Sequence, residues 1–197
     1  MKLGILGGTF DPPHLGHLAA ANEVLVQLAL DEVVFVPAGE PRLKERDDVT
    51  DADIRVLMTR LAIESNHSFS ISEVDVLRPG PTYTVDTLRD IQGEYPGAEL
   101  YFIVGADAAL TIHAWHQADQ LAELANFVAV TRPGTPFSET ALRAQPVELI
   151  RIEAPGVAIS STECRARVPL GLPLRYLVPD AVADLIATFG LYMDLQH

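Results

Sequence analysis

Two histidines three residues apart have the types and spacing best suited to chemistry in this chain. His14 and His17 belong to the run GGTFDPPHLGH, which occupies residues 7–17. This run follows an apolar stretch at residues 3–6 that predicts a strand, and it precedes a helical pattern that begins near Leu15. Residues three apart lie on one face of a first helical turn. Imidazoles placed there can donate hydrogen bonds to phosphate oxygens and titrate close to neutral pH.

Gly7 and Gly8 mark the point where the predicted strand gives way to the helix. Unpaired N–H groups and the helix dipole favour an anion at such a helix start, and glycines let a ligand approach the main chain closely. The segment therefore predicts a phosphate site. The alternative is an ordinary strand-turn-helix, in which Gly and Pro form the turn and both histidines lie on the surface.

The elements that must position these residues are apolar, β-branched stretches alternating with helical segments. Strands are predicted at residues 2–6, 32–36, 69–74, 99–104, 127–131 and 147–151. Helices are predicted at residues 15–29, 51–64, 84–94, 117–125, 161–167 and 180–188. Nearly all-apolar strands alternating with helices predict one α/β domain over residues 1–197, Rossmann-like, with a doubly wound and mostly parallel sheet.

Ligands of such folds bind at the carboxyl ends of the strands. The glycine and histidine run lies at one such end, and Gly105 and Asp107 lie at another, directly after the strand predicted at residues 99–104. Asp51 is predicted to cap a helix, and Ser161 to open one. Residues 38–50 form a polar connection of the size that is either functional or disordered.

Composition narrows the classes of protein. The formal net charge of −13 over 197 residues argues against nucleic acid as a partner, because that partner needs a broad cationic surface. One cysteine, Cys164, rules out an internal disulfide framework. The sequence shows no leader pattern and no apolar run long enough for a membrane, so we expect a cytoplasmic protein, as a monomer or a homo-oligomer.

Four further segments extend the pattern of residues 7–17 along the chain. They are VPAG at 36–39 leading to Lys44, PTYTVDTL at 81–88, FIVGAD at 102–107 with Trp115 and then RPG at 132–134, and ISSTECR at 159–165 with RYLVP at 175–179. With GGTFDPPHLGH, they make the chain resemble the bacterial nicotinate-nucleotide adenylyltransferases of the nucleotidylyltransferase superfamily, from the first strand to the last helix. The first and last motifs are shared across the superfamily, whereas PTYTVDTL and the Asp107 to Trp115 block are typical of this branch.

The resemblance implies transfer of an adenylyl group from ATP to nicotinate mononucleotide, giving nicotinate adenine dinucleotide and pyrophosphate in NAD biosynthesis. It implies no covalent enzyme intermediate, and the protein then mainly positions phosphates and neutralises charge. Mg²⁺ is expected to enter on the ATP phosphates, since Mg²⁺ usually takes few protein ligands in such sites. No zinc or other protein-held metal site is expected, because the histidine pair lacks a suitable third ligand.

The resemblance also implies which residues bind ATP. His17, His14, Lys44 and Arg165 are the expected catalytic residues. The expected ATP-binding residues are Gly7, Gly8, Thr9, Phe10, His14, His17, Gly105, Asp107, Ser160, Ser161, Thr162 and Arg165. For Lys44 the alternative is an ordinary solvated lysine. For Ser160 to Arg165 it is plain helix capping with an exposed arginine, and for Asp107 it is a buried aspartate that caps the next helix.

The mononucleotide is expected to bind Thr84, Trp115, His116 and Arg132. Trp115 would stack on the pyridine ring, although a lone tryptophan is more often part of a core. N–H groups near Thr84 and His116 would bind the nicotinate carboxylate, which favours the acid over the amide. For Arg132, the alternative is that Arg-Pro-Gly forms only a turn.

Leu43 departs from the pattern of the family, in which a histidine often precedes the loop lysine. Either Arg42 substitutes for that histidine, or the loop closes differently. Two other functions remain open at this point: a phosphopantetheine adenylyltransferase, which shares both phosphate motifs, and a nucleotide-binding module without turnover. The presence of His17, Lys44 and Arg165 argues against the second of these.

Overall fold

The computed structural model describes residues 1–40, 49–131, 144–156 and 158–193. Six strands form a single sheet in which every pairing is parallel. They are β1 (Lys2–Gly8), β2 (Glu32–Pro37), β3 (Phe69–Ile71), β4 (Glu99–Gly105), β5 (Asn126–Thr131) and β6 (Leu149–Glu153), in the order β3-β2-β1-β4-β5-β6. The chain order reverses between β1 and β4, which is the place where doubly wound sheets bind their ligands.

Helices connect the strands and cover both faces of the sheet. The α-helices are α1 (Leu15–Gln27), α2 (Ala52–Ile63), α3 (Val74–Leu77), α4 (Thr84–Glu94), α5 (Ala106–Ala109), α6 (Leu121–Leu124), α8 (Ser161–Arg167) and α9 (Asp180–Phe189). Two short 3₁₀ helices, η2 (Ile112–Ala114) and η3 (Ala118–Gln120), lie between α5 and α6. The prediction of an α/β fold with a doubly wound parallel sheet is confirmed.

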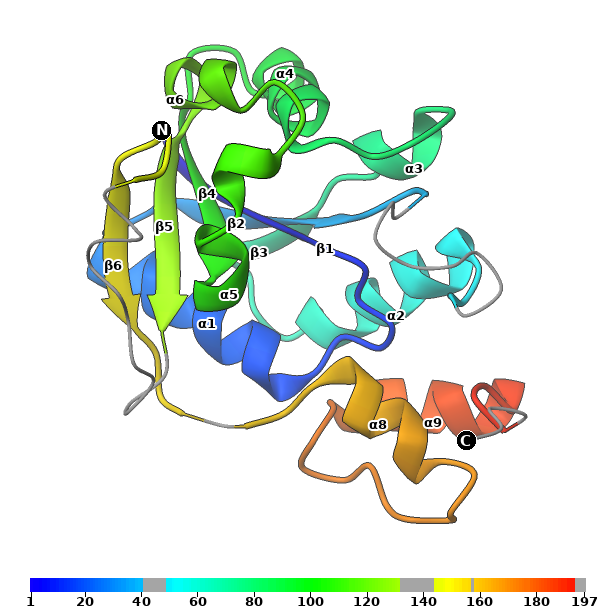
Figure 1. Ribbon diagram of the computed structural model, residues 1–197. Helices are drawn as coiled ribbons and strands as arrows, with labels where there is room; N and C mark the ends of the chain where they lie inside the picture. The colour runs from blue at the N-terminus through cyan, green and yellow to red at the C-terminus, as the bar shows by residue number, and fades with distance from the viewer. Residues whose placement is uncertain (41–48, 132–143, 157, 194–197) are drawn as a thin grey trace.

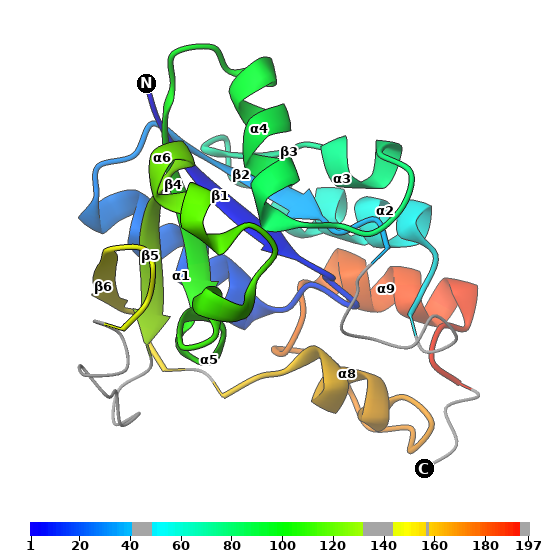
Figure 2. The ribbon, with the colours of Figure 1, turned by 45° about the horizontal axis from the view of Figure 1, so that its top comes forward.

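The alternation of side chains along the strands makes two cores, one on each face. Leu3 and Ile5 of β1 pack with α4, α5 and α6 on one face, whereas Leu6 packs with α1, α2 and α9 on the other. Figure 1 shows α4 and α6 on one side of the sheet and α1, α2, α8 and α9 on the opposite side. Helices α2 and α9 lie side by side in both views (Figures 1 and 2).

The structure corrects four of the predicted elements. The strand expected at residues 69–74 ends at Ile71, and only Ser72 and Glu73 separate it from α3, which begins at Val74. The helix expected at 117–125 starts only after Gln117, which adopts a left-handed conformation with φ of 51°, and it consists of the two short pieces η3 and α6. The helix expected at 15–29 ends two residues early, and the last strand lies two residues later than predicted.

Candidate functional site

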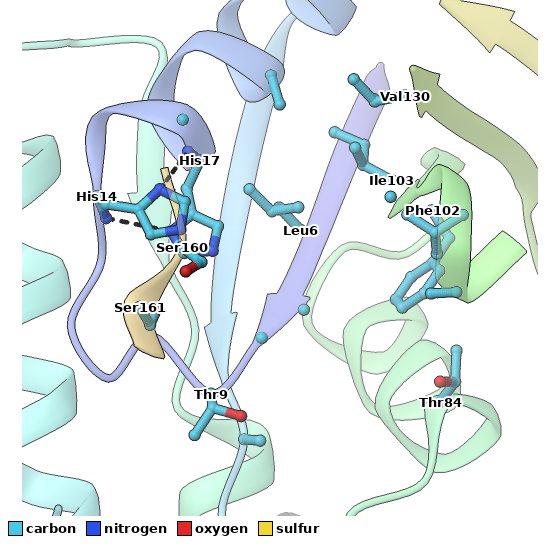
Figure 3. Close-up of a pocket in the computed structure, with 18 of the residues that line it drawn as sticks. Leu6, Thr9, His14, His17, Thr84, Phe102, Ile103, Val130, Ser160 and Ser161 are labelled. Atoms are coloured by element: carbon cyan, nitrogen blue, oxygen red, sulfur yellow. Dashed lines mark hydrogen bonds between the residues drawn. The ribbon is translucent and has the colours of Figure 1, made fainter. Parts of the chain in front are cut away.

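A cavity of about 690 Å³ opens at the carboxyl ends of β1 and β4, where the chain order reverses. One end is lined by the β1–α1 connection and the start of α8, and the other by the first turn of α4 and by Trp115. Figure 3 shows His14, His17, Ser160 and Ser161 on one side of this space and Thr84 and Phe102 on the other. The cavity therefore has two ends, which different segments of the chain supply. They are named after the groups expected there: the end at the β1–α1 connection and α8 is the phosphate end, and the end at α4 and Trp115 is the mononucleotide end.

His14 and His17 begin α1 as a reciprocal pair of caps. The His17 N–H donates to Nδ1 of His14 at 3.3 Å, and the His14 N–H donates to Nδ1 of His17 at 3.1 Å. The rings stack with centroids 3.6 Å apart, and both line the cavity. A nitrogen that accepts a hydrogen bond carries no proton, so each neutral ring holds its proton on Nε2.

Phe10 lies beneath this pair rather than in the cavity. Its side chain is 2% exposed, it contacts the His17 ring edge to face at 5.1 Å, and it also packs on Phe35. A Cβ atom on Gly8 would approach the Phe10 ring to 3.1 Å, so the ring would have to shift to admit a side chain there. Phe10 therefore supports the His17 ring and does not itself line the cavity.

The start of α8 lies against the β1–α1 connection. The Ser160 hydroxyl caps α8 by accepting from the Glu163 N–H at 3.1 Å. Ser161 Oγ donates to the Pro12 carbonyl at 2.9 Å, and Arg165 donates to the Asp11 carbonyl at 2.8 Å. The two segments expected to bind phosphate are thus joined directly, although about 150 residues separate them in the chain.

Arg55 of α2 connects three segments around the phosphate end through hydrogen bonds. It was not among the residues predicted from the sequence. The side chain is 1% exposed and donates to the carbonyls of Thr9, Ala38, Gly39 and Thr50 at 2.7–3.0 Å. Burial lowers the pKa of Arg55, and the nearby Asp11 carboxylate opposes that shift. An arginine within a helical pattern has no sequence signature for such contacts, because its acceptors are main-chain groups of distant residues.

The other end of the cavity is built around the first turn of α4. No side chain caps the N-terminus of this helix, and Thr84 is its first residue. Such a helix start favours an anion. Trp115 is half-buried, meets Phe102 edge to face with ring centroids 6.2 Å apart, and lines the same cavity. His116 is exposed and lies on the Tyr83 ring at 4.2 Å, outside the cavity lining.

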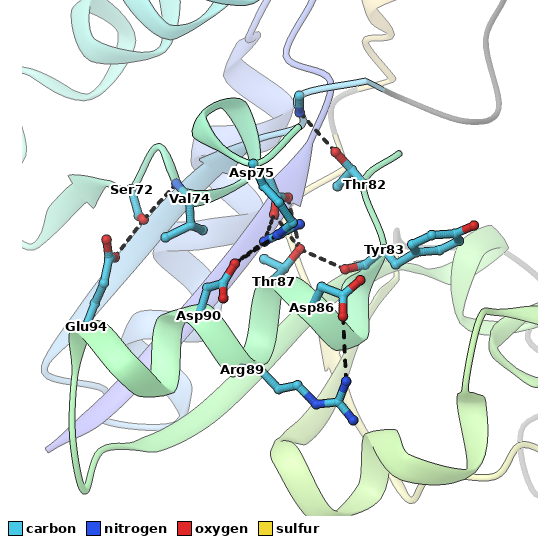
Figure 4. A network of polar contacts seen from close by, with 12 residues as sticks. Ser72, Val74, Asp75, Thr82, Tyr83, Asp86, Thr87, Arg89, Asp90 and Glu94 are labelled. Carbon is cyan, nitrogen blue, oxygen red and sulfur yellow. Dashed lines mark hydrogen bonds and ion pairs between the residues drawn. The ribbon is translucent and has the colours of Figure 1, made fainter. Parts of the chain in front are cut away.

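A polar network holds α3 against α4 below this helix start (Figure 4). Asp75 is 3% exposed, and its two carboxylate oxygens lie 2.8 and 2.9 Å from the Thr87 hydroxyl. Arg78 donates to Asp75 at 2.9 Å and also pairs with Asp90. Burial raises the pKa of Asp75, while Thr87 and Arg78 oppose that shift. A Cβ atom on Gly39 would lie 2.2 Å from the Asp75 carbonyl, so this position requires glycine.

Comparison with known proteins identifies the family. A model described as cytidylyltransferase-like matches residues 5–167. A protein of Saccharopolyspora erythraea, named a probable nicotinate-nucleotide adenylyltransferase, is 52% identical over 97% of this chain and 89% of its own length. A protein of Leifsonia xyli with the same name is 53% identical over 97% of this chain and 94% of its own length. The chain belongs to the nicotinate-nucleotide adenylyltransferase branch of the cytidylyltransferase-like family.

Solved structures of adenylyltransferases share the fold. A Plasmodium falciparum nicotinic acid mononucleotide adenylyltransferase complexed with NaAD superposes with a TM-score of 0.82 at 21% identity, over 97% of each chain. A putative nicotinate-nucleotide adenylyltransferase of Vibrio parahaemolyticus gives a TM-score of 0.71 at 20% identity, over 99% of this chain and 98% of that one.

The remaining residues expected from the adenylyltransferase resemblance occupy different places. Gly105 lines the cavity, and a Cβ atom there would meet nothing within 4 Å. Asp107 is exposed in α5 and caps no helix, which contradicts the alternative of a buried capping aspartate. Thr162 is exposed and lies outside the cavity lining. Lys44 and Arg132 lie outside the described residues, as do Leu43 and Arg42.

Within the described residues, no group of three or more His, Cys, Asp or Glu side chains is placed to hold a metal ion. The helices seen here are too short or too polar to traverse a bilayer. Cys164 is buried in α8, where burial raises the pKa of its thiol to about 11, so it is not placed as a nucleophile.

Proposed function

We propose that this protein transfers the adenylyl group of ATP to nicotinate mononucleotide, the activity named for its relatives. The observation that carries the proposal is a single cavity with phosphate donors at one end and an uncapped helix start beside an aromatic ring at the other. ATP binds at the end formed by His14, His17 and the start of α8. The mononucleotide binds at the end formed by Thr84 and Trp115.

In the proposed reaction, a phosphate oxygen of the mononucleotide attacks the α-phosphorus of ATP. The new P–O bond forms as the bond to the β-phosphate oxygen breaks, and pyrophosphate leaves. No side chain forms a covalent bond, so the enzyme acts by holding two anions close together and by stabilising the charge that develops. The Nε2–H groups of His14 and His17 donate to the phosphate oxygens, with His17 nearest the developing charge.

Mg²⁺ would be supplied to this site with ATP rather than by protein ligands. The described lining of the phosphate end offers hydrogen-bond donors and hydroxyl groups, and it lacks a cluster of acidic ligands. Such a lining suits a cation that arrives with the nucleotide, and that cation would supply neutralisation of part of the charge on the leaving pyrophosphate. The proposal thus assigns no protein side chain as a metal ligand.

Preference for the acid over the amide follows from the start of α4. The first N–H groups of this helix have no side-chain cap, and the dipole favours negative charge there. A carboxylate gains from both effects, whereas a neutral amide gains little. The net charge of −13 fits small anionic substrates that bind in a local pocket better than it fits nucleic acid. We place the reaction in the cytoplasm.

The deciding experiment measures pyrophosphate release from Mg-ATP with nicotinate mononucleotide, nicotinamide mononucleotide or phosphopantetheine as the acceptor. We expect the fastest release with nicotinate mononucleotide. Release with phosphopantetheine alone would move the protein to another branch of the superfamily. If no acceptor supports release while ATP still binds in calorimetry, the chain is a nucleotide-binding module without turnover.

A further inference from the structure

The turn after α9 brings a tyrosine back to the phosphate end of the site. Helix α9 ends at Phe189, the φ of 62° at the next residue, Gly190, reverses the chain, and the Leu191 N–H donates to the Ile186 carbonyl at 3.0 Å. Tyr192 follows with a φ of 67°. Its hydroxyl donates to Oδ1 of Asp11 at 2.6 Å. The two partners of this hydrogen bond are separated by 181 positions in the sequence.

Asp11 is a buried carboxylate that depends on its donors. Its side chain is 0% exposed, and its second oxygen accepts from the Thr50 N–H at 3.2 Å. The buried charge of Arg55 compensates it from nearby. A carboxylate removed from water is costly unless it is hydrogen-bonded and its charge is balanced. Burial, together with the neighbouring Asp11, raises the pKa of Tyr192, so the hydroxyl keeps its proton and remains a donor.

The main chain at Asp11 connects this buried group to both phosphate-binding segments. The Asp11 carbonyl accepts from Arg165 at 2.8 Å, and the adjacent Pro12 carbonyl accepts from Ser161 at 2.9 Å. His14 caps α1 only two residues further along. A rotation of the chain at Asp11 would therefore move the histidine pair and the start of α8 relative to each other.

We propose that Tyr192 is a positioning residue for adenylyl transfer, acting through Asp11 to fix the β1–α1 connection against the start of α8. The inference rests on the proposed function and adds to it a residue that touches no substrate. Tyr192 orients the Asp11 carboxylate, and Asp11 holds the carbonyls to which Arg165 and Ser161 donate. The mononucleotide end of the cavity takes no part in this chain of contacts.

The test replaces the hydroxyl alone, with the variant Tyr192→Phe. We expect kcat for pyrophosphate release to fall about tenfold or more, because a small displacement of oriented groups has a large effect on rate. The KM of nicotinate mononucleotide should change by less than about twofold, since the contacts traced here run only to the phosphate end. Thermal unfolding of the variant establishes that it is folded at the assay temperature.

Tyr176→Phe is the matched control, because it removes the same hydroxyl from a ring that is 78% exposed. This control should keep the wild-type kcat. Wild-type kcat in Tyr192→Phe would overturn the inference, and so would equal changes in both KM values at unchanged kcat, since either result means that the ring only packs.

A double-mutant cycle separates an action through Asp11 from a separate effect. Asp11→Asn should lower kcat, and adding Tyr192→Phe should lower it by less than about a further twofold. Effects that multiply independently would overturn the inference. Failure of the wild-type enzyme to release pyrophosphate with nicotinate mononucleotide would instead overturn the proposed function, so the two failures are distinguishable.

Discussion

The two ends of the cavity are built in different ways. At the phosphate end, His14 and His17 of the β1–α1 connection cap each other. Hydrogen bonds to the buried side chains of Arg55 and Asp11 fix the same connection from the protein interior. At the mononucleotide end, the surfaces come from α4 and from the segment after α5, which are stabilised by apolar packing and by the network around Asp75. The groups expected to meet ATP are therefore fixed by hydrogen bonds, whereas Trp115 is fixed by contact with its neighbours.

Because of this difference, we expect substitutions at the two ends to have different effects. Because the hydrogen bonds of the phosphate end are buried, the loss of one partner leaves a polar group without compensation. Truncation of a side chain at the mononucleotide end removes contact area, and this affects mainly the ligand that lies against that side chain. We expect variants of the first kind to lower stability or kcat, and variants of the second kind to raise a single KM.

The largest expected effect is that of Arg55→Leu. The substitution removes the donors to four main-chain carbonyls and leaves the buried Asp11 charge less balanced. We expect the free energy of unfolding to fall by about 3–5 kcal/mol, measured by urea denaturation. Arg60→Leu in the same helix is the control, with a side chain 53% exposed, and should cost about 0–1 kcal/mol. Equal losses of unfolding free energy in the two variants would contradict a stabilising role for the buried hydrogen bonds of Arg55.

His17→Ala should remove catalysis without removing ATP binding. We expect kcat to fall by about 10²–10³-fold, on the order of 3–4 kcal/mol of transition-state stabilisation, because one oriented donor is lost. Rates come from pyrophosphate release and ATP affinity from calorimetry. His67→Ala, which alters an exposed histidine on the α2–β3 connection, should match the wild-type enzyme. A near-normal rate in His17→Ala would rule out its assigned role.

Trp115→Ala tests the mononucleotide end. Loss of stacking is expected to raise the KM of the mononucleotide about tenfold or more, while the KM of ATP stays within about twofold. In the wild-type enzyme, the mononucleotide should quench the fluorescence of this single tryptophan. If both KM values rise together, Trp115 serves only to pack against Phe102.

The smallest expected effect is a change in the pH dependence of stability in Asp75→Asn. Burial raises the pKa of Asp75 above its usual 3.8, so the folded state binds its proton more tightly than the unfolded state. The stability that this carboxyl contributes is present below about pH 3.8 and is lost as the pH rises through the raised value. Urea denaturation from pH 4 upward should therefore show the asparagine variant gaining relative to wild type. A constant difference would contradict this assignment.

The sequence predicted best the elements whose signals are local. The bounds of α4 and α8 match the predicted ranges, and the all-parallel sheet follows from apolar strands that alternate with helices. The prediction of a strand through residue 74 was wrong. Apolar residues occur both in β3 and in the first turn of α3, and over so short a run their spacing does not distinguish a strand from a helix. Helix α8 begins at Ser161, as predicted, and the Ser160 hydroxyl caps it, whereas Asp51 makes no side-chain cap.

The sequence by itself determined the histidine pair and its place at a helix start, because both depend on contacts between residues three apart. Only the tertiary structure decided which distant groups support that pair. Arg55 donates to main-chain carbonyls, which every residue carries, so no residue type marks its partners. Tyr192 reaches Asp11 because α9 packs beside α2 and Gly190 reverses the chain. Such contacts are selected by packing across the whole domain, and a local pattern carries no record of them.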